Sequence, residues 1–244
     1  MASCKQQHKL QPPKNIMTTT ITNTTICFDL DGTLVDTSAD LLEALRHAMA
    51  TKNLKTGPNE KLRQIIGEGA REMIVRSCKF QGATLSKPEI DDLWKIMVDY
   101  YKQNISELST PYAGATEAID QLKSQGVLIT LCTNKAKDLT DKLLNDLSLT
   151  KHFDAITCGD SFDFKKPDPN HLWETIKRAN GDPKKAIMIG DSKNDIHAAR
   201  NASLPVIGVD WGYTDIPMID LKPDLIISGF DGLQDAVLEL SKEM

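Results

Sequence analysis

Short apolar runs alternate with longer amphipathic segments along most of the chain. The apolar runs are typical of parallel strands that are buried on both faces. They are "TICF" (25–28), "VLITLC" (127–132), "AITC" (155–158), "AIMIG" (186–190), "PVIGV" (205–209) and "LII" (225–227). Between the later runs, apolar residues recur at helical spacing over 114–126, 137–147, 169–180 and 193–202. This alternation predicts a doubly wound α/β fold with a mainly parallel sheet.

Residues 38–106 interrupt this alternation. They contain no convincing strand and are predicted to form the helices "SADLLEALRHAMATKNL", "NEKLRQIIG", "GAREMIVRSC" and "SKPEIDDLWKIMVDYYKQNI". Both connections of this segment to the rest of the chain lie near the carboxyl end of the first strand, where open α/β sheets bind ligands. We therefore predict a helical cap domain at 38–106, inserted into an α/β catalytic core at 25–37 and 107–244, and expect it to act as a lid.

Residues 1–24 are polar, and we predict a disordered N-terminal extension there. The extension resembles an organelle transit peptide only weakly, and Met17 is an alternative start. The chain has no apolar stretch long enough for a signal peptide or a membrane span, which favours a cytoplasmic protein. Its 244 residues are 40% hydrophobic and suffice for a sizeable core, and the net charge of −5 argues against nucleic acid or a membrane surface as partner.

The five cysteines are odd in number, widely spaced and without a CxxC pair. This pattern predicts neither a disulfide framework nor a zinc site, and it fits a reducing compartment. Three of them, Cys27, Cys132 and Cys158, lie in or beside apolar runs, where we expect them to pack as small buried hydrophobic residues.

Two pairs of acidic residues follow predicted strands. Asp29 and Asp31 come directly after "TICF", and alternate strand residues face the same way if the extended conformation persists. Asp191 follows "AIMIG", and Asp195 lies four residues later, on the same face of a helix that starts there. We expect the strand ends to bring all four acids together. Two carboxylates about 4 Å apart repel by roughly 4 kcal/mol at an effective dielectric constant near 20, so such a cluster must bind cations, share protons or be solvated separately. Carboxylate oxygens in this arrangement suit Mg²⁺.

Two further stretches predict a phosphate-binding site. Thr133 and Asn134 end a strand just before a helix, where a hydroxyl, an amide and backbone N–H groups can face an anion. In "FKKPDPNHL", Pro167 favours an extended Lys166, while Asp168 and Pro169 predict an N-cap and a first helical residue. Lys166 is thereby expected to lie outside the helix, free to meet the phosphate.

The stretches "DLDGTLVDT", "TNK", "KKPDP" and "GDSKND" occur in this order and resemble the four motifs of the haloacid dehalogenase-like hydrolase superfamily, over residues 25–228. The helical segment is placed as in members with an α-helical cap. Three stretches, "TNKAKDLTDKLLNDLSL", "GDSFDFKKPDP" and "VIGVDWGYTD", are most similar to phosphoglycolate phosphatases. The resemblance implies a Rossmann-like core and a phosphoric monoester hydrolase that acts on a small phosphorylated metabolite, 2-phosphoglycolate.

The resemblance also implies a role for each acid. Asp29 is expected to attack phosphorus and form an aspartyl-phosphate, and Asp31 to protonate the leaving alkoxide and later deprotonate water. Mg²⁺ is expected to bind Asp29, the backbone carbonyl of Asp31 and Asp191, with Asp195 in the second shell of the metal.

The same resemblance assigns phosphate binding to Thr133 and Asn134, and charge balance to Lys166. Related capped enzymes act on pyrophosphate, nucleotides or sugar phosphates, or transfer phosphate as mutases. A metal-free dehalogenase is opposed by Asp31 and by the second acidic pair, and an inactive binding protein by the complete set of reactive residues. We further expect Arg71, in "IGEGAREMIVRS", to contact a carboxylate of the substrate from a helix start, unless its glycines only form a turn.

Overall fold

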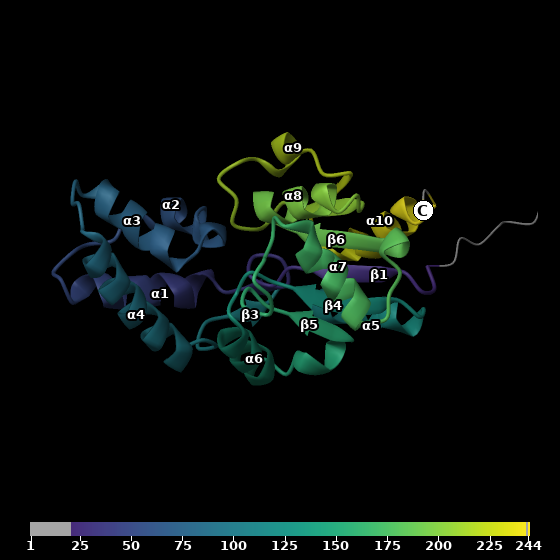
Figure 1. Cartoon of the computed structure of the whole chain (residues 1–244), viewed down its shortest axis with the longest axis horizontal. Coiled ribbons are helices and arrows are strands. Elements are labelled where there is room, and N and C mark those ends of the chain that lie inside the picture. The colour runs from purple at the N-terminus through teal and green to yellow at the C-terminus, as the bar shows by residue number, and fades with distance from the viewer. Residues whose placement is uncertain (1–20, 243) are drawn as a thin grey trace, which may run out of the picture.

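A six-stranded parallel sheet forms the centre of the computed structural model, which describes residues 21–242 and 244 (Figure 1). Its strands are β1 (Thr25–Phe28), β4 (Leu128–Cys132), β5 (Ala155–Thr157), β6 (Ala186–Gly190), β7 (Val206–Val209) and β8 (Leu225–Ile227). They lie in the order β5-β4-β1-β6-β7-β8, and Ile26 of β1 aligns with Ile129 of β4 and Ile187 of β6. The predicted doubly wound parallel sheet is confirmed.

Helices cover both faces of this sheet. α7 (Pro169–Arg178) and α8 (Lys193–Asn201) pack on one face, and α5 (Ala115–Ser124) and α10 (Leu233–Leu240) on the other. α6 (Lys137–Asp146) follows β4 and packs against the same core cluster as α5. The central strands β1 and β6 are buried at every residue, as their uninterrupted apolar runs predict. Shorter elements are α9 (Met218–Leu221) and the 3₁₀ turns η2 (Thr150–His152), η3 (Pro183–Lys185) and η4 (Phe230–Gly232).

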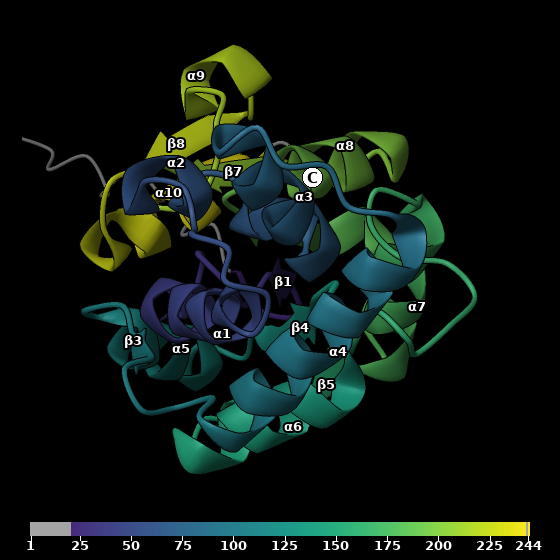
Figure 2. The same cartoon turned by 90° about the vertical axis from the view of Figure 1, so that its left-hand side faces the viewer.

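The inserted helices gather at one end of the molecule, beside the carboxyl ends of the strands (Figures 1 and 2). They are α1 (Ser38–Ala50), α2 (Asn59–Arg63), α3 (Ala70–Phe80) and α4 (Lys87–Gln103), with the 3₁₀ turn η1 (Ile66–Glu68). α1 and α3 pack against α4 through buried side chains such as Leu45, Met73 and Met97. Ser86 and Glu89 form a capping box that starts α4. The helical character of this segment is as predicted, and its independence as a cap domain stays a prediction.

Two short strands connect the helical segment to the core. β2 (Val35–Asp36) and β3 (Thr110–Pro111) pair in antiparallel fashion, so the chain leaves and re-enters the core at one place. Asp40, in the first turn of α1, is buried and accepts hydrogen bonds from the N–H groups of Leu108 and Ser109 and from the Ser109 hydroxyl. The two connections are therefore held side by side.

The N-terminal boundary differs from the prediction. Residues 1–20 lie outside the described residues, but 21–24, which the sequence assigns to a disordered extension, pack against the core. Ile21 is buried, and the Asn23 N–H group donates to the Gly126 carbonyl at 3.0 Å. An apolar residue four positions before β1 thus belongs to the core.

Cys27, Cys132 and Cys158 are buried free thiols, as predicted, and so is Cys78. Burial raises the pKa of Cys27 to about 12, so this thiol stays protonated at neutral pH. Among residues 21–242 and 244, no helix is both long and apolar enough to cross a membrane.

Candidate active site

A cavity of about 610 Å³ lies over the carboxyl ends of the three central strands. β4, β1 and β6 are neighbours in the sheet, so the residues that follow them meet at one edge. Helices of the inserted segment contribute apolar side chains to the cavity wall, among them Met73, Trp94 and Met97. All seven predicted site residues line this cavity: Asp29, Asp31, Thr133, Asn134, Lys166, Asp191 and Asp195.

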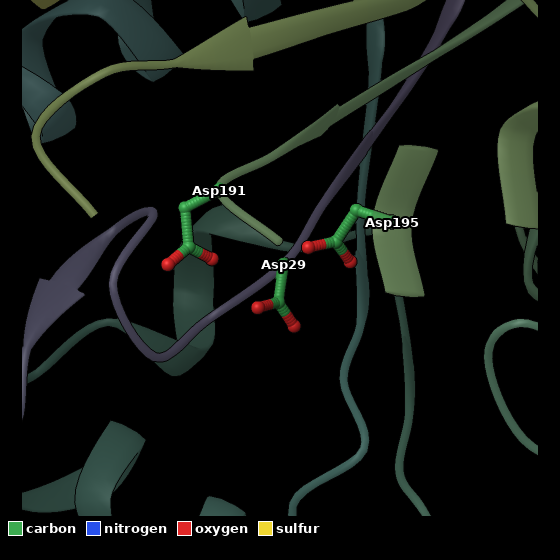
Figure 3. A group of neighbouring side chains, drawn as sticks. All are labelled: Asp29, Asp191 and Asp195. Carbon is green, nitrogen blue, oxygen red and sulfur yellow. The ribbon is translucent and has the colours of Figure 1, made fainter. Parts of the chain in front are cut away.

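Three buried carboxylates converge at this strand edge (Figure 3). Asp29, Asp191 and Asp195 each offer one oxygen, and these oxygens all lie within 4.8 Å of one another. The Lys166 ammonium contacts two of them, at 2.8 Å from Asp29 Oδ1 and 2.6 Å from Asp195 Oδ1. Three carboxylates against this one ammonium leave an excess of negative charge.

The excess of negative charge contributes to raised pKa values of two of these carboxyl groups. Burial raises the pKa of Asp29 to about 7, with Lys166 opposing the rise and Asp195 adding to it. Burial, followed by the charges of Asp195 and Asp29, raises the pKa of Asp191 well above its usual value. A set of oxygen ligands with uncompensated charge fits a hard divalent cation, which would relieve the repulsion.

Asp191 is held in place from two sides. The Thr33 hydroxyl donates to Oδ1 at 3.2 Å, and the Tyr213 N–H group donates to Oδ2 at 2.7 Å. Gly32 lies directly against this carboxylate with φ at +85°, and a Cβ atom there would collide with it. A glycine is therefore required after Asp31, both for the left-handed turn and for the close approach.

Asp195 has hydrogen-bond donors at both oxygens. Oδ1 accepts from Lys166, and Oδ2 accepts from the Ser192 N–H group at 3.0 Å and the Ser192 hydroxyl at 2.6 Å, which forms the capping box of α8. The side chain thus connects Lys166 to the start of α8, next to Asp191. This position supports the expected role behind the metal rather than in direct contact with it, which stays a prediction.

The backbone of Lys166 is clamped by its neighbours. Its N–H group donates to His171 Nδ1 at 3.2 Å, and its carbonyl accepts from Asn134 Nδ2 at 2.8 Å. Asp168 caps α7 by accepting from the Asn170 N–H group, and α7 begins at Pro169, as the sequence predicts. Lys166 therefore stands outside the helix, with its side chain buried among the acids.

Thr133 and Asn134 lie between β4 and α6. Thr133 is buried, and its hydroxyl accepts from the Lys135 N–H group at 3.2 Å. Asn134 donates one amide hydrogen to Lys166, and an amide nitrogen carries two. Both residues line the cavity and retain donor capacity toward an anion in it.

Asp31 lines the same cavity as the other three acids, as predicted, but its carboxylate does not belong to their close group. β1 ends at Phe28 and the chain turns at Gly32, so the strand alternation that predicts parallel side chains does not extend to Asp31. Its Oδ1 instead accepts from the Thr37 hydroxyl at 2.6 Å and from the Lys135 ammonium at 2.9 Å.

Lys135 and Tyr101 are site residues that the sequence analysis did not single out. The Lys135 ammonium contacts the Tyr101 hydroxyl at 2.8 Å as well as Asp31, and both side chains are almost fully buried. Lys135 directly follows Thr133 and Asn134, which was the available signal. Nothing in the sequence marks Tyr101 as a site residue, because it occupies one of the regularly spaced positions that form the buried face of α4.

Polar contacts join the inserted helices to the core beside the cavity. Glu68 of η1 pairs with Lys193 of α8 at 3.2 Å and with Arg76 of α3 at 2.9 Å. The Tyr213 hydroxyl accepts from the N–H groups of Thr37 and Ser38 and donates to Asp36, at the connection into α1. Tyr213 therefore touches both the Asp191 carboxylate and the base of the helical segment.

Arg71 lies near the start of α3 and lines the cavity, as expected. Its guanidinium is about half exposed, forms an ion pair with Asp91 and lies 4.3 Å from the Trp94 ring centroid. The preceding Gly69 has φ at +95°, so the glycines do form a turn here. Its predicted contact with a substrate stays a prediction.

Comparison with known proteins gives consistent matches along the chain. A family model for haloacid dehalogenase-like hydrolases matches residues 26–209. A phosphoglycolate phosphatase of Agrobacterium fabrum is 46% identical over 212 residues, which cover 87% of this chain and 91% of that protein. One of Caulobacter vibrioides is 38% identical, with 88% and 91% covered. A crystal structure described as a predicted phosphoglycolate phosphatase from Haemophilus somnus 129pt superposes with a TM-score of 0.82 at 29% identity, covering 90% of this chain and 99% of that one.

Proposed function

Because the chain belongs to the haloacid dehalogenase-like hydrolases, we propose that it is a Mg²⁺-dependent phosphatase that hydrolyses 2-phosphoglycolate to glycolate and phosphate. Phosphatases of this family act on small phosphorylated substrates and generally use a divalent metal ion. The identity of the substrate rests on the similarity to phosphoglycolate phosphatases over nearly their whole length. A cytoplasmic location stays a prediction from the sequence.

The observation that carries the proposal is the environment of Asp29. This carboxylate is buried, lines the cavity, contacts the Lys166 ammonium at 2.8 Å and offers an oxygen within 4.8 Å of one from Asp191. With its pKa raised to about 7 by burial, the metal-free carboxyl is only partly ionised at neutral pH, and a bound cation would favour the carboxylate form. Such a group is poised to act as a nucleophile when a divalent metal and a phosphate ester enter the site together.

The reaction has two in-line displacements at phosphorus. In the first, an Asp29 oxygen forms a bond to phosphorus while the bond to the glycolate oxygen breaks, and Asp31 gives its proton to that oxygen. In the second, Asp31 takes a proton from a water molecule whose oxygen attacks the aspartyl-phosphate, and the bond between phosphorus and Asp29 breaks. Phosphate leaves and both aspartates return to their starting states.

The surroundings of Asp31 suit this proton transfer. Its carboxylate lies apart from the three clustered acids and is oriented by Thr37 and Lys135 through hydrogen bonds to Oδ1. Within residues 21–242 and 244, no hydrogen bond reaches its other oxygen, Oδ2, which can therefore meet the leaving group and the water molecule. A residue that must exchange a proton twice in each turnover benefits from a fixed position outside the metal cluster.

The carboxylates of Asp29 and Asp191, with the backbone carbonyl of Asp31, would hold Mg²⁺, as the family resemblance implies. A cation bound there supplies charge neutralisation, so that an anionic nucleophile and a phosphate dianion approach each other. The site suits a divalent cation because the clustered acids offer oxygen ligands with an excess of negative charge.

Lys166, Thr133 and Asn134 would bind the phosphate oxygens. The Lys166 ammonium already contacts the nucleophile at 2.8 Å, so it can balance charge on Asp29 and on the phosphoryl group during transfer. Thr133 and Asn134 offer a hydroxyl and an amide at the same strand edge. Asp195 holds Lys166 in position from behind.

A panel of phosphate esters tests the proposal. Phosphate release from 2-phosphoglycolate, glucose phosphates, nucleotides and pyrophosphate is measured with Mg²⁺ and with EDTA, for the wild type, Asp29→Asn and the control Asp235→Asn. Asp235 is an exposed residue of α10. We expect the wild type and the control to prefer phosphoglycolate and to need Mg²⁺, and a folded Asp29→Asn protein to be inactive. A different preferred ester would refute the substrate, and turnover by Asp29→Asn would refute the covalent mechanism.

A further inference from the structure

The Lys135 ammonium occupies an unusual position for a lysine. Its side chain is only 6% exposed, and it lies between Asp31 of the core and Tyr101 of the inserted helix α4. The ammonium is also 4.6 Å from the Tyr101 ring centroid. A buried ammonium is costly unless it is paired, and Asp31 supplies the pairing charge here, beside the cavity.

Lys135 keeps binding capacity toward the cavity. An ammonium has three donors, and the contacts with Asp31 and Tyr101 account for two of them among the described residues. The ion pair with the Asp31 carboxylate at 2.9 Å stabilises the charged form of this lysine. The group therefore remains a cation, and it lines the cavity.

Its neighbour Asp31 indicates which part of a substrate it meets. In the proposed reaction, Asp31 exchanges a proton with the leaving oxygen of the ester. In phosphoglycolate, the carboxylate is attached to the same methylene carbon as this oxygen. An ammonium in contact with Asp31 is therefore close to the substrate carboxylate, whereas Lys166, in contact with Asp29, is close to the phosphorus.

Other cations of the cavity are less suited to this carboxylate. Within the described part of the chain, the cationic residues that line the cavity are Arg71, Lys135, Lys165 and Lys166. Arg71 is about half exposed and pairs with Asp91, and Lys165 is exposed, so solvent screens both charges. A buried charge acts in a medium of lower dielectric constant and discriminates more strongly between an anion and a neutral group.

We propose that Lys135 is a specificity-determining residue whose ammonium binds the carboxylate of the substrate beside the leaving oxygen. This role of Lys135 rests on the proposed function. Recognition of the substrate carboxylate then falls to a residue of the core, whereas the sequence alone predicts it for Arg71 of the helical segment. Tyr101 then positions the ammonium from α4, so that substrate selection depends on how the helical segment sits over the core.

The test compares two esters of similar shape, one with a charged carboxylate and one with a neutral carboxamide. Values of kcat/KM with Mg²⁺ are measured for 2-phosphoglycolate and for its carboxamide analogue, phosphoglycolamide, using the wild type, Lys135→Met, Arg71→Met and Lys165→Met. We expect Lys135→Met to reduce the preference for the carboxylate roughly 10- to 100-fold, the range for a hydrogen bond to a charged group. Arg71→Met and Lys165→Met are expected to change it less than about three-fold, as for exposed charges.

Other results of this comparison would overturn the role of Lys135 or the proposed substrate. An equal loss of kcat/KM on both esters in Lys135→Met would show that Lys135 acts only by orienting Asp31, and it would overturn the inference. A loss of preference in Arg71→Met or Lys165→Met instead would overturn it as well. If circular dichroism shows Lys135→Met to be unfolded, Lys135→Gln, which keeps a hydrogen-bond donor, takes its place. A wild type that releases phosphate from other esters but not from phosphoglycolate would refute the proposed substrate itself.

Discussion

Replacing Asp29 by asparagine should stabilise the metal-free protein while abolishing its activity. Asp29, Asp191 and Asp195 lie together with Lys166, so the wild-type cluster has three carboxylates around one ammonium. Asparagine has nearly the same shape as aspartate, and its Oδ1 can still accept from Lys166. The substitution therefore removes one buried charge and little packing.

The magnitude follows from the pKa of Asp29, which is about 7 in the folded protein against an ordinary value of 3.8. Between pH 3.8 and pH 7 the folded chain binds more protons than the unfolded chain. The stability of the metal-free wild type therefore falls as the pH rises through this range, and it falls no further above pH 7. The difference between the folded and unfolded pKa of Asp29 lowers the free energy of unfolding of the metal-free wild type. The loss is at most about 4 kcal/mol at pH 8 and roughly 2 kcal/mol at pH 5. We expect Asp29→Asn to gain about 2–4 kcal/mol at pH 8, and less at pH 5.

Urea and thermal denaturation in EDTA at pH 5 and pH 8 measure this gain. For a chain of this size, about 2–4 kcal/mol raises the melting temperature by roughly 5–15 °C. The exposed control Asp235→Asn should change stability by less than about 0.5 kcal/mol at either pH. Added Mg²⁺ should shrink the advantage of Asp29→Asn, because a metal ion that binds the folded wild type stabilises it. An Asp29→Asn protein that is no more stable than the wild type at pH 8, or equally stabilised at both pH values, would refute this account of the cluster.

Four further outcomes are expected. Asp31→Asn should still release a single-turnover burst of p-nitrophenol from p-nitrophenyl phosphate, whose leaving group needs little protonation, but no such burst of glycolate from phosphoglycolate. Loss of the burst on both esters would contradict the proton-transfer role. EDTA should stop phosphate release and Mg²⁺ should restore it, with Ca²⁺ a poor substitute because of its larger and looser coordination; full activity after chelation would exclude the metal. Lys166→Met, which leaves Asp29 and Asp195 without their ammonium, should lower the free energy of unfolding by about 3–5 kcal/mol at pH 8 in EDTA, and a loss below about 1 kcal/mol in urea titrations would count against the buried pairs. Tyr213→Phe removes the acceptor for two buried N–H groups and should cost about 1–3 kcal/mol by the same titrations, whereas an unchanged stability would mean that water replaces the hydroxyl.

The parts of the fold that follow from local pattern were predictable. β1, β6 and β8 coincide with the apolar runs at 25–28, 186–190 and 225–227, because a strand covered on both faces needs an uninterrupted apolar run. β2 and β3 were not predicted. Each has only two residues, and their pairing depends on the return of the chain after the helical segment, which no local pattern encodes.

The positions of some site residues also follow from local sequence, whereas others depend on contacts between distant segments. Asp29, Lys166 and Asp191 are fixed by strand ends and by a proline-flanked loop, so their convergence follows from the order of strands in a parallel sheet. Asp31 reaches the same cavity, but its carboxylate stands outside the close group of three because the backbone turns just after β1. The contact between Lys135 and Tyr101 joins residues of two distant segments, and it depends on how α4 lies against the core.

The pairing of β2 with β3 has a consequence for how the protein can change over evolutionary time. Since Asp36 is aligned with Thr110, the helical segment begins and ends at one point of the core, as a closed loop does. The entropy lost in closing a loop grows only with the logarithm of its length, so a doubling adds only about 0.6 kcal/mol. Lengthening or shortening the segment between these two strands therefore adds little to the entropy cost of closing it. The helical wall of the cavity can thus change in length without moving the strand ends that carry the aspartates.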